Sequence, residues 1–221
     1  MDRFNGTTVG PNWKVYNDPE GSTPRTVQSV SESGGSLNLI GHYQAPYGYV
    51  GGGVANVVNQ TYGMWEIQFR ADAGAGYEPA VLLWPEGTWP NDGEIDLAEV
   101  FPGTAQPAST NRVGFGQFLH MGADDSFLSH RQPGINFSHW QTVAVTWLPG
   151  KITYWLNGKP TWTITAGEGG MDYIPDTPFH LALQLDENCN DRCAPNSSTP
   201  SQVVMQVNWV KVWAMPGSPS S

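Results

Sequence analysis

The sequence predicts an all-β fold: an antiparallel sandwich of two sheets, formed by a single domain over residues 1–214. The length of 221 residues is ordinary for one domain of this kind. From about residue 36 to residue 213, short apolar-rich segments are separated by Gly, Pro, Asn and Asp, and no convincing helical period appears. The last residues, 215–221 (MPGSPSS), have the composition of a flexible tail.

Ten segments are expected to be strands. In chain order they are residues 36–43, 63–72, 80–84, 93–100, 112–120, 141–148, 151–158, 161–166, 179–185 and 203–213. Pro-Gly in LPGK (148–151) and Asn-Gly in LNGK (156–159) are typical of hairpin turns, so residues 141–166 are expected to form a three-stranded meander. Ten strands without an internal repeat favour two antiparallel sheets packed face to face.

The amino-acid composition limits which kinds of partner the protein can bind. The formal charge of −10 argues against binding to nucleic acid, because that requires clustered Lys and Arg, and a neutral ligand fits better. No apolar run approaches the roughly 20 residues of a membrane span. Aromatic residues make up 12% of the chain, so some rings are expected at the surface, where their flat faces suit stacking against a ligand.

The segment PNDGEIDLAEV (90–100) places four acids among apolar residues. Asp92 precedes the strand and is expected in a turn, whereas Glu94 and Asp96 share one strand face because side chains alternate. Glu99 would face the other side unless a bulge adds one residue near Leu97 and Ala98. With that bulge, all three acids project from the same face.

The predicted geometry of these acids fits a retaining glycosidase. Four effective strand steps separate the Cα atoms of Glu94 and Glu99 by roughly 13 Å, and converging side chains would bring the carboxyls to about 5 Å. Retaining glycosidases place their two carboxyls ~5 to 5.5 Å apart, whereas inverting enzymes need roughly 6.5 to 9.5 Å. A solvated edge or a calcium site is the structural alternative, and it ranks lower because Ile95, Leu97 and Val100 indicate a central strand.

GEIDLAEV resembles the signature of family 16 glycoside hydrolases, in the bulged Glu-x-Asp-x-x-Glu form of laminarinase-like members. Further similar blocks occur in the same order as in the family: YGMWEIQFR (62–70), PAVLLWPEGTWPNDGEIDLAEV (79–100), QTVAVTWLPGKITYWLNGK (141–159) and VNWVKVW (207–213). The resemblance implies a concanavalin A-like jelly-roll sandwich with an open cleft on its concave face. It also implies Glu94 as the nucleophile, Glu99 as the acid/base and Asp96 as the assisting acid.

The resemblance implies four binding residues as well: Trp84, Trp89, His120 and Gln184. Trp84 ends an apolar strand and could instead belong to the core, whereas Trp89 lies in a polar loop and is the better platform for a sugar ring. His120 could be a hydrogen-bonded strand residue, and Gln184 is the weakest of the four. The remaining histidines are scattered, so no metal site is expected.

Several residues depart from the family pattern. Gln68 and Thr146 stand where many members have Arg and an acid, and the stretch after Gln184 lacks the usual glycines, so this rim of the cleft is expected to be unusual. Asn208 stands where the family often has an Asp that helps to bind structural calcium. No cofactor is therefore required, and calcium is doubtful.

Cys189 and Cys193 lie in a polar loop, where a disulfide is the preferred interpretation and two free thiols the alternative. A disulfide would indicate an extracellular protein, and a zinc site is disfavoured because no His pair is near. The N-terminus lacks the features of a signal peptide, and Met1 is interpreted as a start codon placed on a mature protein.

Together these features predict a secreted, monomeric, retaining endo-glycosidase that cleaves a β-1,3-glucan or a mixed β-1,3/1,4-glucan. One alternative is the same chemistry on a galactan-type polymer such as agarose or carrageenan, although only ten Lys and Arg disfavour a heavily sulfated one. The other alternative is a non-catalytic, lectin-like sandwich, which would not need two glutamates at this spacing. A polysaccharide lyase is disfavoured because no suitable base lies near Arg.

Overall fold

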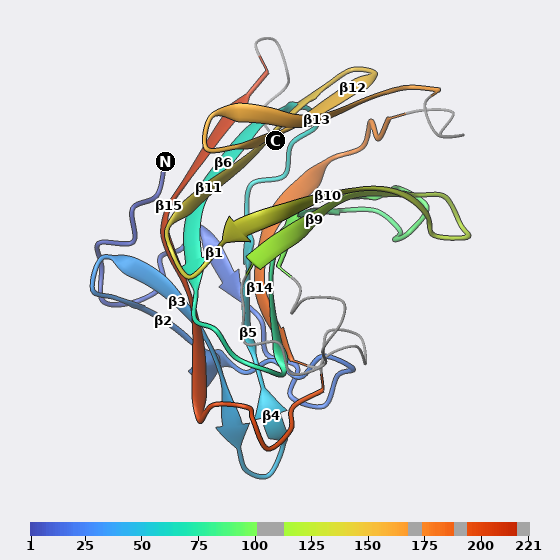
Figure 1. Ribbon diagram of the computed structural model, residues 1–221. Coiled ribbons are helices and arrows are strands. Elements are labelled where there is room, and N and C mark those ends of the chain that lie inside the picture. The colour runs from blue at the N-terminus through green and yellow to red at the C-terminus, as the bar shows by residue number, and fades with distance from the viewer. Residues whose placement is uncertain (101–112, 168–173, 188–193, 216–221) are drawn as a thin grey trace.

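The computed structural model describes residues 1–100, 113–167, 174–187 and 194–215. These residues form two antiparallel sheets that lie face to face (Figure 1). The seven-stranded sheet has the order β1 (Trp13–Val15), β5 (Gly52–Asn56), β14 (Phe179–Glu187), β7 (Tyr77–Pro85), β8 (Glu94–Glu99), β9 (Val113–Met121) and β10 (Ser126–Asn136). The predicted all-β jelly-roll sandwich is confirmed.

The eight-stranded sheet contains the predicted meander. Its order is β13 (Lys159–Thr165), β12 (Lys151–Leu156), β11 (Gln141–Leu148), β6 (Gly63–Ala71), β15 (Gln202–Ala214), β3 (Ser36–Gln44) and β2 (Val30–Ser33), with β4 (Gly48–Val50) paired to β3. A single 3-10 turn, η1 (Val27–Ser29), precedes β2. No helix in the described ranges is both long and apolar enough to cross a membrane.

All ten predicted strands are present, with ends that move by at most a few residues. Five further strands were not predicted: β1, β2, β4, β5 and β10. Four of these are only three to five residues long, whereas β10 contains Pro133 and Gly134, which disfavour a strand in sequence terms. The boundary of the domain at residue 214 stays a prediction. Residues 216–221 of the expected tail and the Cys189–Cys193 pair lie outside the described residues.

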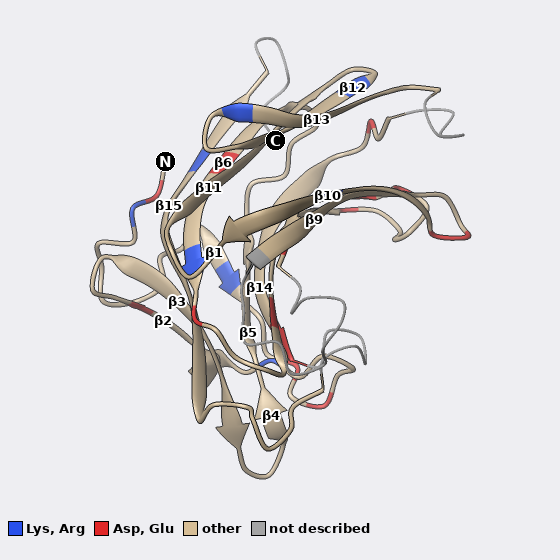
Figure 2. Cartoon of the chain, in the orientation of Figure 1, with Lys and Arg blue, Asp and Glu red and all other residues tan. Residues whose placement is uncertain are grey.

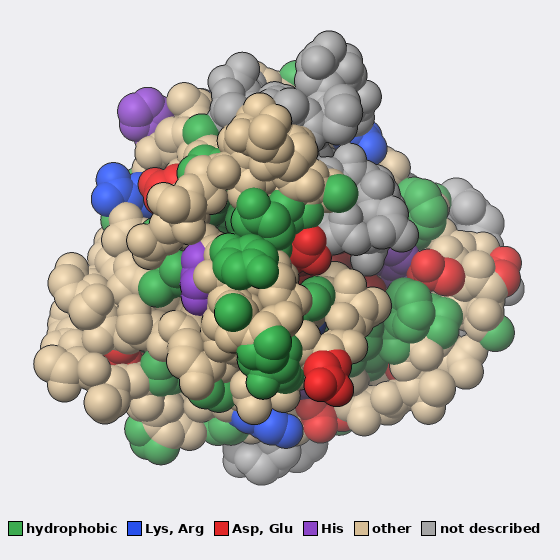
Figure 3. Space-filling view, turned by 90° about the horizontal axis from the view of Figure 1, so that it is seen from below, with side chains coloured by type: hydrophobic (Ala, Val, Ile, Leu, Met, Phe, Trp, Pro, Cys, Tyr) green, Lys and Arg blue, Asp and Glu red, His purple; other side chains and the backbone are tan. Residues whose placement is uncertain are grey.

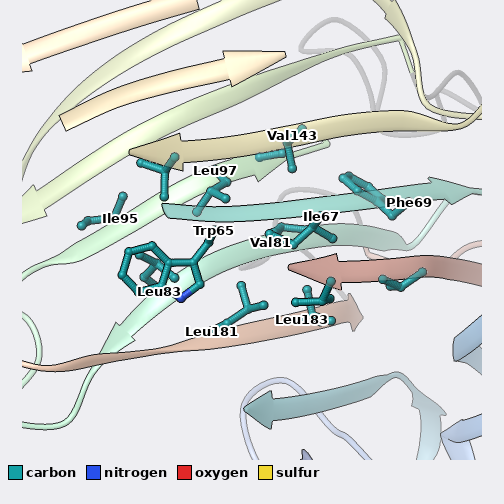
Figure 4. Close-up of a cluster of buried hydrophobic side chains, with 14 of the residues drawn as sticks. Trp65, Ile67, Phe69, Val81, Leu83, Ile95, Leu97, Val143, Leu181 and Leu183 are labelled. Carbon is teal, nitrogen blue, oxygen red and sulfur yellow. The ribbon is translucent and has the colours of Figure 1, made fainter. Parts of the chain in front are cut away.

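The core lies between the two sheets. Every second residue of the central strands points into it, as in Val81 and Leu83 of β7, and these side chains meet Trp65, Ile67 and Phe69 of β6 (Figure 4). All five are at most 1% exposed. Burial of a side chain of this size stabilises the fold by roughly 1.5–3 kcal/mol, so the central strands are held firmly in register.

Three consecutive glycines allow the segment before η1 to lie on the seven-stranded sheet. A Cβ atom at Gly51 would be 1.9 Å from the carbonyl oxygen of Leu185, and one at Gly52 would be 2.3 Å from that of Ser29. At Gly53 it would be 2.5 Å from the ring of Tyr16 and 3.2 Å from Cδ of Arg25. Gly53 therefore allows Tyr16 and Arg25 to lie against the face of the sheet opposite the core, while Gly51 and Gly52 allow close approach of the backbone at Leu185 and Ser29.

Candidate active site

The bulge predicted in β8 is present. Along β7, Leu82 pairs with Asp96 and Val81 pairs with Ala98, so Leu97 is the extra residue. Leu97 and Ala98 are both fully buried in the core cluster. Because two successive residues face the core, the alternation is reset, and Glu99 returns to the face that carries Glu94 and Asp96. This face, opposite the core, is called the cleft face below.

The turn before β8 positions Glu94. Asp92 accepts a hydrogen bond from the amide of Thr88, and the amide of Asp92 donates to the carbonyl of Thr88 at 3.0 Å, so Asp92 is a turn residue as predicted. Gly93 has φ +92°, and a Cβ there would be 2.9 Å from the carbonyl oxygen of His120. The close approach of the two chains at Gly93 places Glu94 opposite His120 in the sheet.

Trp84 and Trp89 form the floor of the site beside Glu94. Their rings stack with centroids 5.7 Å apart and an interplanar angle of 14°. Nε1 of Trp89 donates a hydrogen bond of 2.7 Å to Oε2 of Glu94. Trp84 is half-buried and packs on Leu82 outside the main core, whereas Trp89 is 40% exposed. Both tryptophans therefore lie at the site, and the alternative that Trp84 belongs to the main core is wrong.

His120 lies between two acids. Its Nε2 atom is 3.3 Å from Oδ2 of Asp96, and its Nδ1 atom is 2.8 Å from Oδ1 of Asp125. Asp96 is completely buried, and its oxygens have no hydrogen bond of good geometry in the described part of the chain. His120 is therefore held in place by Asp125 and presents its other nitrogen to the central acid.

Burial dominates the protonation of the acids. It raises the pKa of Glu94 to about 9, an effect that the charge of Asp96 increases and that His120 and Trp89 oppose. Burial also raises the pKa of Asp96, with a further contribution from the charge of Glu99. Since neighbouring buried carboxyls cannot all ionise cheaply, Glu94 and Asp96 retain a proton between them near neutral pH.

Gln184 belongs to a second polar cluster on the cleft face. Arg25 donates from Nε and Nη2 to Oδ1 of Asp186, at 2.8 and 2.6 Å, and from Nη2 to Oε1 of Gln184 at 3.0 Å. The Arg25 guanidinium carbon lies 5.5 Å from the centroid of the Tyr16 ring. Burial raises the pKa of Asp186, and Arg25 opposes this rise. The cluster is thus a charge-neutral group of fixed hydrogen-bonding atoms.

A cleft of about 790 Å³ extends from this cluster to Glu94. Its lining includes Tyr16, Arg25, Trp84, Glu94 and Gln184. His180 and Glu86, whose side chains are hydrogen-bonded to each other, line it as well. Figure 3 shows apolar side chains beside acidic ones on the face seen from below. Figure 2 shows the acids gathered mainly on the side of the seven-stranded sheet, while Lys and Arg lie mostly on the other sheet.

The structure brings together all seven residues predicted from the sequence. The separation of the Glu94 and Glu99 carboxyls stays a prediction. The sequence analysis missed Arg25, Tyr16, Asp125 and His180, because each reaches the site from a segment that carries no motif. The glycine triplet at 51–53 was the one local signal that another segment crosses the sheet there.

Asn208 lies at a bulge in β15, and its amide donates to Oε1 of Gln68 at 2.6 Å. Gln68 in turn donates to Thr142 at 3.3 Å, so two residues that depart from the family pattern contact each other across the eight-stranded sheet. No group of three or more His, Cys, Asp or Glu side chains suited to a metal ion occurs among the described residues.

The fold and the cleft define a class: β-sandwich proteins with three carboxyls on one bulged strand. A family model, "Glycosyl hydrolases family 16", matches residues 20–211. The chain therefore belongs to family 16 of the glycosyl hydrolases.

A curated relative, a beta-glucanase of Rhodothermus marinus, is 27% identical over 137 residues, which cover 57% of this chain and 47% of the relative. The chain thus spans about half the length of this relative. Among solved structures, the catalytic domain of an endo-1,3-beta-glucanase (laminarinase) from Thermotoga petrophila RKU-1 superposes with a TM-score of 0.79 at 17% identity, covering 100% of this chain and 96% of the other. The endo-beta-1,3-glucanase from Pyrococcus furiosus gives a TM-score of 0.78 at 21% identity, with coverages of 100% and 94%. At these identities the superpositions establish the fold.

Proposed function

We propose that the protein is an endo-acting glycoside hydrolase that cleaves a β-1,3-glucan or a mixed β-1,3/1,4-glucan with retention of configuration. The observation that carries this proposal is the bulge at Leu97, which returns Glu99 to the face of Glu94 and Asp96. If the three acids were only structural, the bulge would bring them together on one face of a central strand without benefit, and the protein would still incur the cost of buried charge. Membership of family 16 and the beta-glucanase relative favour the same substrate class.

The reaction proceeds in two displacements. Glu94 attacks the anomeric carbon while Glu99 donates its proton to the glycosidic oxygen, so the leaving chain departs as an alcohol and a glycosyl–Glu94 ester remains. Glu99, now a carboxylate, then removes a proton from water, and the water oxygen attacks the same carbon and releases Glu94. Two inversions give net retention.

Two neighbours of Glu94 favour its ionised form, against the opposing effects of burial and of Asp96. Nε1 of Trp89 donates to Oε2 of Glu94, and His120 lowers the pKa of Glu94. Asp96 is completely buried, and burial raises the pKa of both carboxyls of this pair. The pair shares the proton that it retains, and attack on the sugar requires the form in which Asp96 holds this proton and Glu94 carries the charge.

The cleft suits a neutral polymer. Stacked Trp84 and Trp89 offer apolar surface to a pyranose ring, and the Arg25–Asp186 pair contributes donors and acceptors without a net charge. A polymer substrate would be met outside the cell, so we infer that the protein is secreted. We also propose that it acts as a monomer. The Cys189–Cys193 disulfide belongs to the same inference.

The test is hydrolysis of laminarin, barley β-glucan, agarose, carrageenan and xyloglucan by the wild type and by Glu94→Gln. We expect new reducing ends from laminarin or barley β-glucan, with loss of at least about 10³-fold in the variant. Proton NMR of the first product should show the β-anomer. Turnover on agarose or carrageenan alone would favour the galactan alternative, and binding without turnover would favour the lectin-like one. Activity that persists in Glu94→Gln would contradict the assignment of the nucleophile.

A further inference from the structure

One exposed aromatic side chain continues the cleft face beyond the acids. Phe127 lies on β10, the edge strand of the hairpin that β9 and β10 form (Figure 1). Its neighbour Leu128 packs against the core. Because side chains alternate along a strand, Phe127 projects from the cleft face. It is 55% exposed, more than any other Trp, Tyr or Phe on the described strands of this sheet.

The register of the sheet aligns Phe127 with the catalytic strand. Glu94 of β8 lies opposite His120 of β9, and His120 lies opposite Phe127 of β10. Neighbouring strands are about 4.8 Å apart, so the Cα atoms of Glu94 and Phe127 are separated by roughly 10 Å along this row. A polymer that crosses the strands at Glu94 would continue over His120 to Phe127.

The ring of Phe127 is held in position while much of its surface remains exposed. Its centroid is 5.3 Å from that of His120, with an interplanar angle of 33°, and 6.0 Å from that of Phe118. His120 is itself fixed by Asp125 at 2.8 Å. An aromatic platform that is already positioned loses little conformational entropy when a ligand stacks on it.

The cleft lined by Arg25, Gln184 and Trp84 lies on the other side of Glu94 from Phe127. Phe127 does not line that cleft. Glu94, the proposed nucleophile, lines it. The sugar that becomes bonded to Glu94 therefore belongs in that cleft, and the leaving chain belongs on the β9–β10 side.

We propose that Phe127 binds a sugar of the leaving chain by stacking, and so determines how well the protein uses a substrate that extends beyond the cleavage point. This proposal deepens the proposed function and rests on it. Next to Phe127 on the cleft face, two positions along β10, lies the exposed Ser129. Apolar ring surface interrupted by hydroxyl groups suits a polymer whose own surface alternates between C–H faces and hydroxyls.

The test compares two substrates of different length. Laminarihexaose can extend from the cleft to Phe127, whereas 4-nitrophenyl β-laminaritrioside has only an aryl group beyond the cleavage point. For Phe127→Ala we expect kcat/KM to fall about five- to tenfold on the hexaose, as lost ring stacking predicts, and to stay within about twofold on the aryl glycoside. Phe127→Trp should restore the hexaose value. Tyr43→Ala is the matched control, because Tyr43 is 63% exposed on β3 of the other sheet.

The outcomes separate this proposal from the proposed function. Equal losses on both substrates, or no loss on the hexaose, would overturn the role of Phe127 while the hydrolase assignment stands. Failure of the wild type to cleave either substrate would contradict the assignment as a β-1,3-glucan hydrolase instead. In that case calorimetric titration with laminarihexaose decides the role of Phe127: a Kd that is unchanged in Phe127→Ala overturns it, and a weakened Kd supports it.

Discussion

Glu94 has two requirements that conflict. It must be ionised to act as a nucleophile, yet it is only 8% exposed and lies beside a second buried acid. Each donor that favours its charge, such as Nε1 of Trp89, improves catalysis, but ionisation still costs more in the folded protein than in the unfolded chain. The strand therefore loses stability in order to present a charged nucleophile.

This conflict predicts that Glu94→Gln stabilises the protein at neutral and alkaline pH. The folded pKa of about 9 lies above the ordinary value of 4.5, so the wild type is most stable below pH 4.5 as far as this group is concerned and loses stability as pH rises towards 9. Glutamine has no such cost and can still accept from Trp89. We expect the melting temperature of the variant to exceed that of the wild type by about 2 °C or more at pH 8.

Thermal unfolding of both proteins from pH 4 to pH 9 checks this expectation, and the difference should shrink towards pH 4. The exposed Glu20, changed to Gln, is the control and should leave the curve unchanged. A Glu94→Gln variant that is less stable than the wild type at pH 8 would show that ionised Glu94 is stabilised in the fold.

Arg25 offers a second prediction at the residue scale. Arg25→Met keeps much of the side-chain length but removes the two bonds to Asp186 and the one to Gln184. We expect KM for the polymer to rise about tenfold, which corresponds to about 1.4 kcal/mol, with a smaller change in kcat because Arg25 bonds to Asp186 and Gln184 and not to the reacting carboxyls. Arg70→Met is the control, since Arg70 is exposed on the eight-stranded sheet and contacts Trp140. A fall in kcat at constant KM would contradict a binding role.

At the scale of the element, the bulge in β8 determines which acids share a face. Deleting Ala98 would leave Glu94, Asp96 and Glu99 two residues apart in turn, so that a regular strand would still direct all three to the cleft. Inserting one alanine after Ala98 would instead direct Glu99 to the core and Val100 to the cleft. Deletion and insertion are thus matched changes of equal size with opposite expected results.

We expect the deletion variant to fold and to keep measurable hydrolysis, and the insertion variant to lose it and to be destabilised by about 3 kcal/mol or more, because a carboxylate would enter the core without a partner. Urea unfolding and reducing-end assays on both variants check this. Wild-type activity in the insertion variant would contradict the parity argument.

The bulge in β8 was predictable because the sequence of this strand distinguishes its two faces: apolar residues face the core and acids face the cleft. The three-residue spacing from Asp96 to Glu99 breaks the alternation and so indicates one extra residue. Strand β10 was not predictable in this way, because its core-facing positions include half-buried His130 and Gln132, and it contains Pro133. Arg25 reaches the site only because of contacts between distant segments, which local patterns do not encode.

At the scale of the whole molecule, the site depends on how the sheets are joined. Buried hydrogen bonds connect parts of the sandwich. Among them, the hydroxyl of Tyr154 on β12 donates to the carbonyl of Phe118 on β9 at 2.6 Å, and Nε1 of Trp147 on β11 donates to the carbonyl of Pro175 at 2.9 Å. The first lies beneath the strand that carries His120. It therefore fixes the height of β9, and with it the row from Glu94 to Phe127, relative to the opposite sheet.

Tyr154→Phe removes this connection with almost no change in shape. The carbonyl of Phe118 would remain buried with one partner fewer, which costs about 1–3 kcal/mol, and a protein of this size should then melt roughly 2 to 10 °C lower. Calorimetry at pH 7 measures the shift, with Tyr43→Phe as an exposed control that should not change it. An unchanged melting temperature in Tyr154→Phe would mean that this hydrogen bond contributes nothing to the position of the catalytic row, and that packing and the bond from Thr161 on β13 to Gln117 on β9 join the sheets there.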